Sequence, residues 1–311
     1  MFVLPKGVLD RVDAICRTFL WEGSTVHNKA PLIAWSKVCV PKKEGGLGLK
    51  NSHKWNIALI GKLVWWIAAK PDKLWVQWIH HVYLNNVSWQ YYCPPPDISW
   101  YWRKICQVRD LLAEGFSDNV WSIGEDGYSV QSCYNWVRDK QPDVLWSKAI
   151  WSHLAVPKHS FIAWLIAHNA LMLKNRLFQY GIATDNLCCI CHSQTEDLSH
   201  LFHGCSFSRQ VMQELGKWLC SDFTHAQTFV RIARRRWGRI RKEVCTAAVI
   251  ATWYFIWQQR NEARLFNRVM RPVLVIKNVQ QAIRMRFVHY HTKSVSSRDR
   301  SWLVRVHLMS N

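Results

Sequence analysis

Four potential metal ligands follow one another at close spacing in the second half of the chain. Cys188, Cys191, His200 and Cys205 form the pattern C-x2-C-x8-H-x4-C. Thiolate sulfur and imidazole nitrogen are the donors that Zn²⁺ prefers, and four of them complete a tetrahedron. Because no coordination position would remain for water, the pattern predicts a structural zinc and not a catalytic one. Part of the folding free energy of such a knuckle comes from binding the metal.

The spacing alone leaves the choice of ligands open. Cys189 can take the place of Cys188, and His203 or His192 can take the place of His200. The same residues can also be reduced, buried cysteines and a surface histidine without a metal, because cysteine is often a small core residue. A C-x2-C pair with a compatible H-x4-C beyond it favours the metal over this alternative.

The residues around these ligands resemble a known family. The stretch from Trp146 to about Leu215 is similar to the zinc-binding domain that follows the reverse transcriptase in plant non-LTR (LINE-type) retrotransposons. The resemblance rests on Trp146, Ile150-Trp151, Pro157-Lys158, Phe161–Trp164, Asn169, Leu171, Arg176-Leu177, Gly181-Ile182, Cys188, Cys191, Glu196, His200–Phe202, Cys205 and Phe207. It implies a structural zinc as cofactor, and RNA or DNA as partner. Lys174 and Cys189 depart from the family pattern.

The resemblance continues on both sides of this stretch. Upstream, the chain is similar to the segment just downstream of the same polymerases. The matching residues there are Arg17–Trp21, Trp35, Val38–Lys42, Gly45–Gly48, Asn56–Leu59, Trp75 and Tyr83. Downstream, Ile256-Trp257, Arg260-Asn261 and Phe266 resemble the C-terminal end of the same elements. The resemblance therefore spans most of the chain and implies the C-terminal region of such a polyprotein.

Positive charge is concentrated near the end of the chain. The formal net charge is +20, and residues 225–311 hold eighteen Lys or Arg but three acidic residues. Such an asymmetry favours an anionic partner, of which nucleic acid is the commonest, over a solvated helix face with no partner. We expect one helical stretch to contact phosphates with little base specificity. Its cations are Arg231, Arg234, Arg235, Arg236, Arg239, Arg241 and Lys242.

The cysteines and the apolar runs indicate in which cellular compartment the protein is expected. Eleven cysteines in a long chain, with no signal sequence at Met1–Lys6, do not indicate a disulfide framework. We therefore expect a nuclear or cytoplasmic protein that is not secreted. The longest apolar runs, Ile57–Ala69 and Cys245–Trp257, are shorter than the ~20 residues that a membrane span needs. We expect buried helices there and no membrane partner.

We expect a mostly α-helical fold with several helical segments, a small β-hairpin and the zinc-knuckle module. Apolar periodicity and helix-breaking residues predict helices at 3–21, 52–69, 72–84, 99–112, 132–140, 157–169, 171–180, 206–219 and 244–257. Val120–Ile123 and Tyr128–Val130 flank a Gly/Asp turn, which predicts the hairpin. The twenty tryptophans are expected to pack between helices.

The same breaks predict four parts. Residues 1–92 form a helical region that resembles the post-polymerase segment. Residues 93–145, which open with Pro94–Pro96, form a connecting region with the hairpin. Residues 146–219 form the reverse-transcriptase-type zinc-binding domain. Residues 220–311 form a basic helical tail.

The residues of a polymerase core are not found in this sequence. It has no adjacent Asp-Asp pair to hold two catalytic metal ions, and Glu125-Asp126 is explained by turn chemistry. The glycines of Gly45–Gly48 lack the order of a phosphate-binding loop. We therefore expect a zinc- and nucleic-acid-binding protein that is not an enzyme. The alternatives are a protein-interaction module that docks through its Trp-rich helices, a partner that joins a separate polymerase in trans, and a non-functional transposon remnant.

Overall fold

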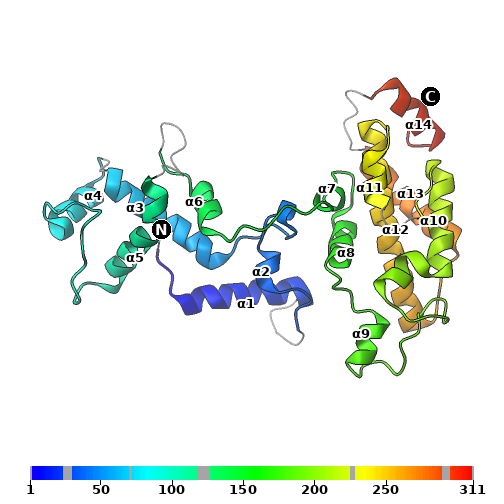
Figure 1. Ribbon diagram of the computed structural model, residues 1–311, viewed down its shortest axis with the longest axis horizontal. Helices are drawn as coiled ribbons and strands as arrows, with labels where there is room; N and C mark the ends of the chain where they lie inside the picture. Colours follow the sequence, from blue (N-terminus) through cyan, green and yellow to red (C-terminus); the bar gives the residue numbers. More distant parts are fainter. Residues whose placement is uncertain are drawn as a thin grey trace. The chain divides into compact units, whose positions relative to one another are not determined.

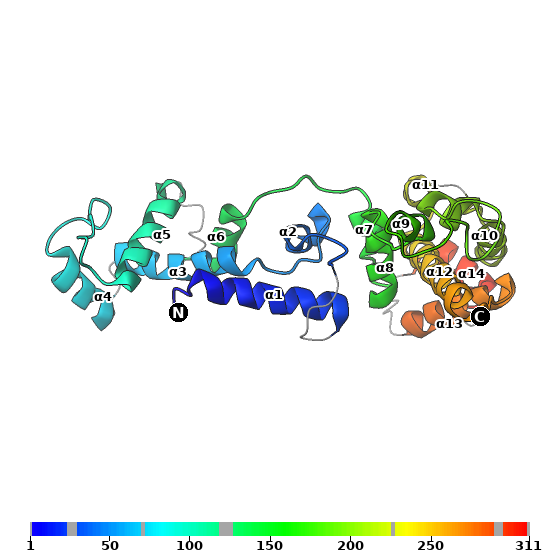
Figure 2. The same cartoon turned by 90° about the horizontal axis from the view of Figure 1, so that it is seen from below.

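The computed structural model describes residues 2–23, 30–69, 72–117, 127–224, 228–288 and 295–309. The described chain is mostly helical and divides into two compact units, residues 1–142 and 143–311, which we treat separately (Figures 1 and 2). The finer division into four parts stays a prediction. In the described ranges there is no strand, and Leu187 and Thr195 form an isolated antiparallel bridge.

The predicted β-hairpin is not supported. Its first arm, Val120–Ile123, lies outside the described residues, as does most of the turn. The second arm ends at Val130, which is the first residue of helix α6 (Val130–Val137). The side chain of Ser129 caps this helix by accepting a hydrogen bond from the N–H of Ser132. A local helix cap therefore overrides the β-prone composition of this arm.

Unit 1 is built around helix α3, whose predicted bounds, 52–69, agree with the structure. This helix packs against α1, α4, α5 and α6 (Figure 1). The elements before α6 are α1 (Lys6–Glu22), α2 (Trp35–Val38), the 3₁₀ turn η1 (Lys42–Glu44), α3 (Ser52–Ala69), α4 (Leu74–Ile79), the π-helical turn η2 (His80–Leu84) and α5 (Trp100–Ser117).

Aromatic residues fill the core of unit 1 between α3 and α5. Trp89 and Trp102 are both buried, with ring centroids 5.5 Å apart, and Tyr83 stacks on Trp102 at 4.7 Å. Gly61 of α3 lies where an added Cβ would collide with the side chains of Tyr128 and Leu112. Glycine is therefore required for the close approach of these neighbours to α3.

Unit 2 is built around the 28-residue helix α12. It packs against α7, α8, α10, α11, α13 and α14. Its middle is buried on all sides, which explains a run that is apolar around the whole helix. The elements are α7 (Ser147–Ile150), α8 (Pro157–Ala167), α9 (Lys174–Gln179), the π-helical turn η3 (His200–Gly204), α10 (Ser206–Leu219), α11 (Thr228–Arg234), α12 (Arg239–Phe266), α13 (Pro272–Val288) and α14 (Ser297–Arg305). In the described chain, none of the helices combines the length and apolar character of a membrane span.

The basic run of unit 2 does not lie in one helix, as the sequence had suggested. Helix α11 ends at Arg234 and α12 begins at Arg239. Between them, Gly238 lies against the carboxylate of Asp299, where an added Cβ would collide with both oxygens. A residue that comes much later in the chain therefore packs directly against this break.

Candidate metal centre

The first two ligands lie on a tight turn. The Cys188 N–H donates to the Gln194 carbonyl at 2.8 Å, and the Leu187–Thr195 bridge closes the base of this loop. At the tip, the N–H of His192 donates to the Cys188 carbonyl at 3.0 Å, with a left-handed φ of 54° at His192. The turn reverses the chain so that the two thiols of the C-x2-C pair lie on the same side.

The second pair comes from the π-helical turn η3. The carboxylate of Asp197 accepts a hydrogen bond from the His200 N–H at 2.6 Å and so fixes the start of this turn. The turn closes where the N–H of Cys205 donates to the His200 carbonyl at 2.6 Å. Cys205 is also the N-cap residue of α10. The wider turn thus presents an imidazole and a thiol to the knuckle.

These four side chains converge on one point. The ligand atoms of Cys188, Cys191, His200 and Cys205 all lie within 4.8 Å of one another. A tetrahedral zinc with ordinary bond lengths has ligand atoms roughly 3.4–3.8 Å apart. Cys188, His200 and Cys205 are buried and Cys191 is half-buried. The cluster can therefore hold a metal ion, and its donor set fits zinc.

Neighbouring side chains orient the ligands. The Nδ1 atom of His200 lies 2.9 Å from Oε1 of Gln194, an oxygen that can only accept a hydrogen bond. A proton on Nδ1 would complete this hydrogen bond and leave the lone pair of Nε2 toward Cys191 Sγ, which lies 3.3 Å away. Ser193 Oγ donates to the same sulfur at 3.2 Å. This arrangement is the one that a zinc-binding histidine requires.

Two of the thiols show opposite pKa shifts. The hydrogen bond between Cys188 and Cys205 lowers the pKa of Cys205, although burial opposes the change, and the N–H groups of Ser208 and Phe207 at the start of α10 lower it further. The same hydrogen bond, together with burial, raises the pKa of Cys188. The hydrogen bond therefore favours the thiolate form at Cys205, beside the positive end of α10, over the thiolate form at Cys188. A bound cation would favour the thiolate form of both.

The structure decides between the alternative ligands. Cys189 lies outside the cluster, and burial raises the pKa of its thiol to about 11. His203 packs its ring edgewise against Trp253, with centroids 6.3 Å apart, and burial lowers its pKa. His192 is exposed at the tip of the turn. The geometry therefore groups Cys188 and His200, and not these three residues, with Cys191 and Cys205.

A buried ion pair that the ligand pattern did not show connects the knuckle to α12. Glu196 and Arg260 are both buried, and the guanidinium donates from Nε at 2.8 Å and from Nη2 at 2.6 Å to Glu196 Oε1. The N–H groups of Lys174 and Cys189 also donate to this carboxylate, at 2.8 and 3.1 Å. Burial alone would raise the pKa of Glu196, but Arg260 and these N–H groups hold it below its usual value. Glu196 and Arg260 are both among the residues that carry the family resemblance. The resemblance did not indicate that they form an ion pair.

The seven predicted nucleic-acid contacts differ in their surroundings. Arg231, Arg234, Arg235 and Arg236 are exposed on α11 and on the break that follows it. Arg239 is exposed as well, and its Nε lies 2.9 Å from the carboxylate of Glu243 in the next turn of the helix. An exposed pair of this kind contributes little to stability and does not prevent contact with a phosphate.

The last two cations of the run are held in place. The guanidinium of Arg241 lies 4.2 Å from the ring centroid of Trp237 and 5.0 Å from that of Trp302. Lys242 donates to the Ala233 carbonyl at 2.8 Å. These two side chains therefore stabilise the junction between α11 and α12, and the exposed arginines form the accessible part of the run.

Comparison with known proteins agrees with the donor set. Residues 128–211 match a family described as zinc-binding in reverse transcriptase. All four residues of the cluster lie inside this segment. The chain is also 36% identical, over 118 residues, to a protein of Arabidopsis thaliana provisionally named a ribonuclease H protein. The aligned stretch covers 36% of this chain and 19% of that relative, so the chain matches about a fifth of the relative's length. No solved structure matches this chain.

Proposed function

We propose that this chain is a zinc-stabilised, nucleic-acid-binding segment from the C-terminal region of a LINE-type reverse transcriptase polyprotein, without its polymerase core. A structural zinc held by Cys188, Cys191, His200 and Cys205 would fix the knuckle. The Glu196–Arg260 ion pair would transmit this order to α12. Helix α12 begins at the basic run, so the same helix contacts both the metal module and the arginines.

The observation that carries the proposal is a groove beside the exposed arginines. Its volume is about 950 Å³, and the aromatic residues Trp146, Trp151 and Phe229 line it. Its charged lining residues are Lys148, Arg234, Lys242 and Glu243, so cations outnumber carboxylates by three to one. Single-stranded nucleic acids bind to surfaces where cations follow the backbone and aromatic rings stack on the bases. The groove offers both kinds of contact on one face of unit 2.

Binding of a labelled 20-nucleotide RNA, and of DNA of the same length, tests the proposal. We expect Arg234→Gln, Arg235→Gln and Arg236→Gln together to weaken binding more than tenfold in 50 mM salt. The slope of log K against log[salt] should fall by about 2, because each lost phosphate contact on a single strand contributes about 0.7.

The matched control removes the same charge from the opposite end of α12 and the loop beyond it. Arg264, Arg268 and Arg271 are exposed in unit 2, and their replacement by Gln should change affinity less than threefold. If the unmodified chain does not bind either nucleic acid in 50 mM salt, the proposal is wrong. Polymerase activity of this chain alone would contradict the absence of a catalytic core.

One observation favours protein docking as a second candidate function. Helix α1 exposes an apolar stripe formed by Val8, Val12, Ile15 and Phe19, and the last of these is 67% exposed. Large exposed apolar patches mark interaction sites. Binding through this stripe would persist as salt rises, whereas phosphate contacts weaken steeply. The salt dependence of any complex therefore separates the two functions.

A further inference from the structure

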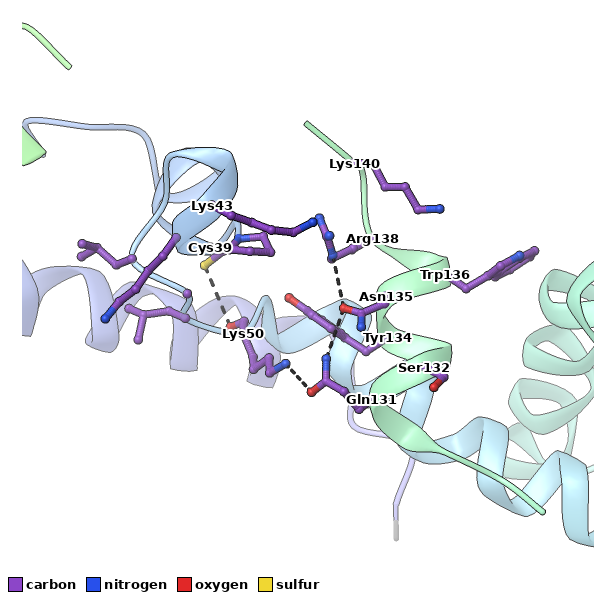
Figure 3. A pocket seen from close by; sticks show the side chains of 15 residues that line it. Cys39, Lys43, Lys50, Gln131, Ser132, Tyr134, Asn135, Trp136, Arg138 and Lys140 are labelled. Atoms are coloured by element: carbon purple, nitrogen blue, oxygen red, sulfur yellow. Dashed lines mark hydrogen bonds between the residues drawn. The ribbon is translucent and has the colours of Figure 1, made fainter. Parts of the chain in front are cut away.

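Unit 1 contains a second basic site, far along the sequence from the arginine run. A pocket of about 870 Å³ lies between the segment 39–50 and helix α6 (Figure 3). Five cations line it: Lys42, Lys43, Lys50, Arg138 and Lys140. None of its described lining residues is an aspartate or a glutamate. A cavity lined by one sign of charge attracts ligands of the opposite sign.

An ion pair between the buried Glu44 and the half-buried Arg138 joins the two walls of this pocket. Nη1 and Nη2 of Arg138 each donate to one carboxylate oxygen of Glu44 at 2.5 Å, and the N–H of Gln141 donates to the same carboxylate at 3.1 Å. The hydrogen bonds from Arg138 lower the pKa of Glu44, which is buried behind the pocket. Glu44 offsets the charge of Arg138, and the other cations among the lining residues are Lys42, Lys43, Lys50 and Lys140.

One of these lysines is held in position by aromatic rings. Lys50 Nζ lies 4.4 Å from the ring centroid of Tyr134 and 5.0 Å from that of Trp55, and it donates to Gln131 Oε1 at 2.7 Å (Figure 3). These contacts fix the ammonium group without a carboxylate among them. Lys42, Lys43 and Lys140 are exposed at the rim.

The loop itself provides no backbone donors for a ligand. The N–H groups of Gly45, Gly46, Leu47 and Gly48 all donate to carbonyl groups of residues 38–42, at 3.0–3.1 Å. A site for the phosphate of a mononucleotide normally presents such N–H groups to the ligand. Lysine ammonium groups act as point charges, which suit a chain of phosphodiesters better than one directional phosphate.

We propose that this pocket binds the phosphodiester backbone of RNA or DNA, as a second contact site in unit 1. The site does not depend on the arginine run, because its residues and its charge lie entirely within residues 39–140. The full chain would then contact nucleic acid with both units, and each site would contribute its own phosphate contacts to the salt dependence.

The test compares two triple variants of the full chain. Lys42→Gln, Lys43→Gln and Lys140→Gln remove rim charges and leave the Glu44–Arg138 pair intact. The control replaces the matched lysines Lys6, Lys73 and Lys104 of unit 1 by Gln. Binding of a labelled 40-nucleotide RNA in 50 mM salt is measured by fluorescence anisotropy. We expect the rim variant to bind about tenfold more weakly, with a salt slope smaller by about 2, and the control to change less than threefold.

Two further measurements on the unmodified chain identify the ligand. RNA should protect Lys42, Lys43 and Lys140 from acylation, as measured by mass spectrometry, and polyglutamate of equal charge should not. Equal loss of affinity in both triple variants, or protection by polyglutamate as strong as by RNA, would overturn the proposal. If the rim variant binds normally while the Arg234–Arg236 variant does not, only the arginine run binds nucleic acid and the proposed second site is wrong. If the rim variant loses binding while the Arg234–Arg236 variant binds normally, the arginine run is refuted as a binding site and the second site stands.

Discussion

The Glu196–Arg260 ion pair gives the sharpest test of how the metal module is joined to α12. Glu196→Gln keeps the shape of the side chain but removes its charge. Arg260 is 2% exposed and cannot lose its proton, so the variant leaves a buried cation without a counter-charge. Breaking a buried pair in this way costs about 3–5 kcal/mol. We expect the free energy of opening of α12 to fall by this amount.

The opposite replacement has a smaller and pH-dependent effect. In Arg260→Met, Glu196 keeps the N–H groups of Lys174 and Cys189 and can also take up a proton. Protonating a carboxyl of ordinary pKa at pH 7 costs about 3.7 kcal/mol. The stability lost in Arg260→Met cannot exceed this cost by much, because protonation removes the buried charge. The cost shrinks by about 1.4 kcal/mol for each pH unit by which the pH falls. The double variant Glu196→Gln with Arg260→Met has no buried charge. It should be less destabilised than the sum of the single variants by at least about 2 kcal/mol.

Hydrogen exchange of peptides from α12, measured on zinc-saturated full chain, reports this free energy without a contribution from unit 1. The pKa of Glu196 is lowered in the folded state, so its contribution is present above the unfolded pKa and is lost as the pH falls through the folded value. Protection of α12 should therefore decrease in acid. A loss below about 1 kcal/mol in Glu196→Gln, or additive effects in the double variant, would refute the account of the pair.

Three further predictions concern the cluster and the core. Elemental analysis should find one zinc per purified chain and none in Cys191→Ser with His200→Ala; no zinc in the unmodified folded chain would contradict a working metal site. Cys189→Ser should keep its zinc, because this thiol lies outside the cluster, and a loss of metal there would show that the ligands were assigned wrongly. Gly61→Ala should lower the stability of unit 1 by about 1–3 kcal/mol in urea denaturation, because the added methyl overpacks the contact with Tyr128; an unchanged midpoint would show that this contact can relax.

The features that could be predicted from the sequence are local ones. The bounds of α10 agree with the predicted helix at 206–219, and those of α3 with 52–69. The ligand spacing likewise indicated the cluster, because a turn and a short helix segment bring such residues together without help from distant parts of the chain. Cys189 and His203 could not be set aside from spacing, since only the packing of each side chain excludes it.

The features that were missed depend on residues far apart in the sequence. Glu196 and Arg260 are 64 positions apart, and nothing in the pattern around either residue indicates its partner. Gly238, in the break between α11 and α12, lies against the carboxylate of Asp299. Similarly, the basic pocket of unit 1 forms only when a loop near residue 45 meets a helix near residue 135. The composition showed the excess of positive charge near the C-terminal end. It did not show the second cluster of cations, which forms in the pocket of unit 1.

The packing around one side chain of α12 sets how the metal and a bound nucleic acid can influence one another. His203 of η3 and Phe229 of the groove both pack edgewise against Trp253, with ring centroids 6.3 and 5.0 Å from it. The same tryptophan therefore contacts the metal module and the proposed binding groove. An effect of zinc on affinity would pass through this packing, and a variant that keeps it ordered without metal should bind nucleic acid as tightly as the zinc form does.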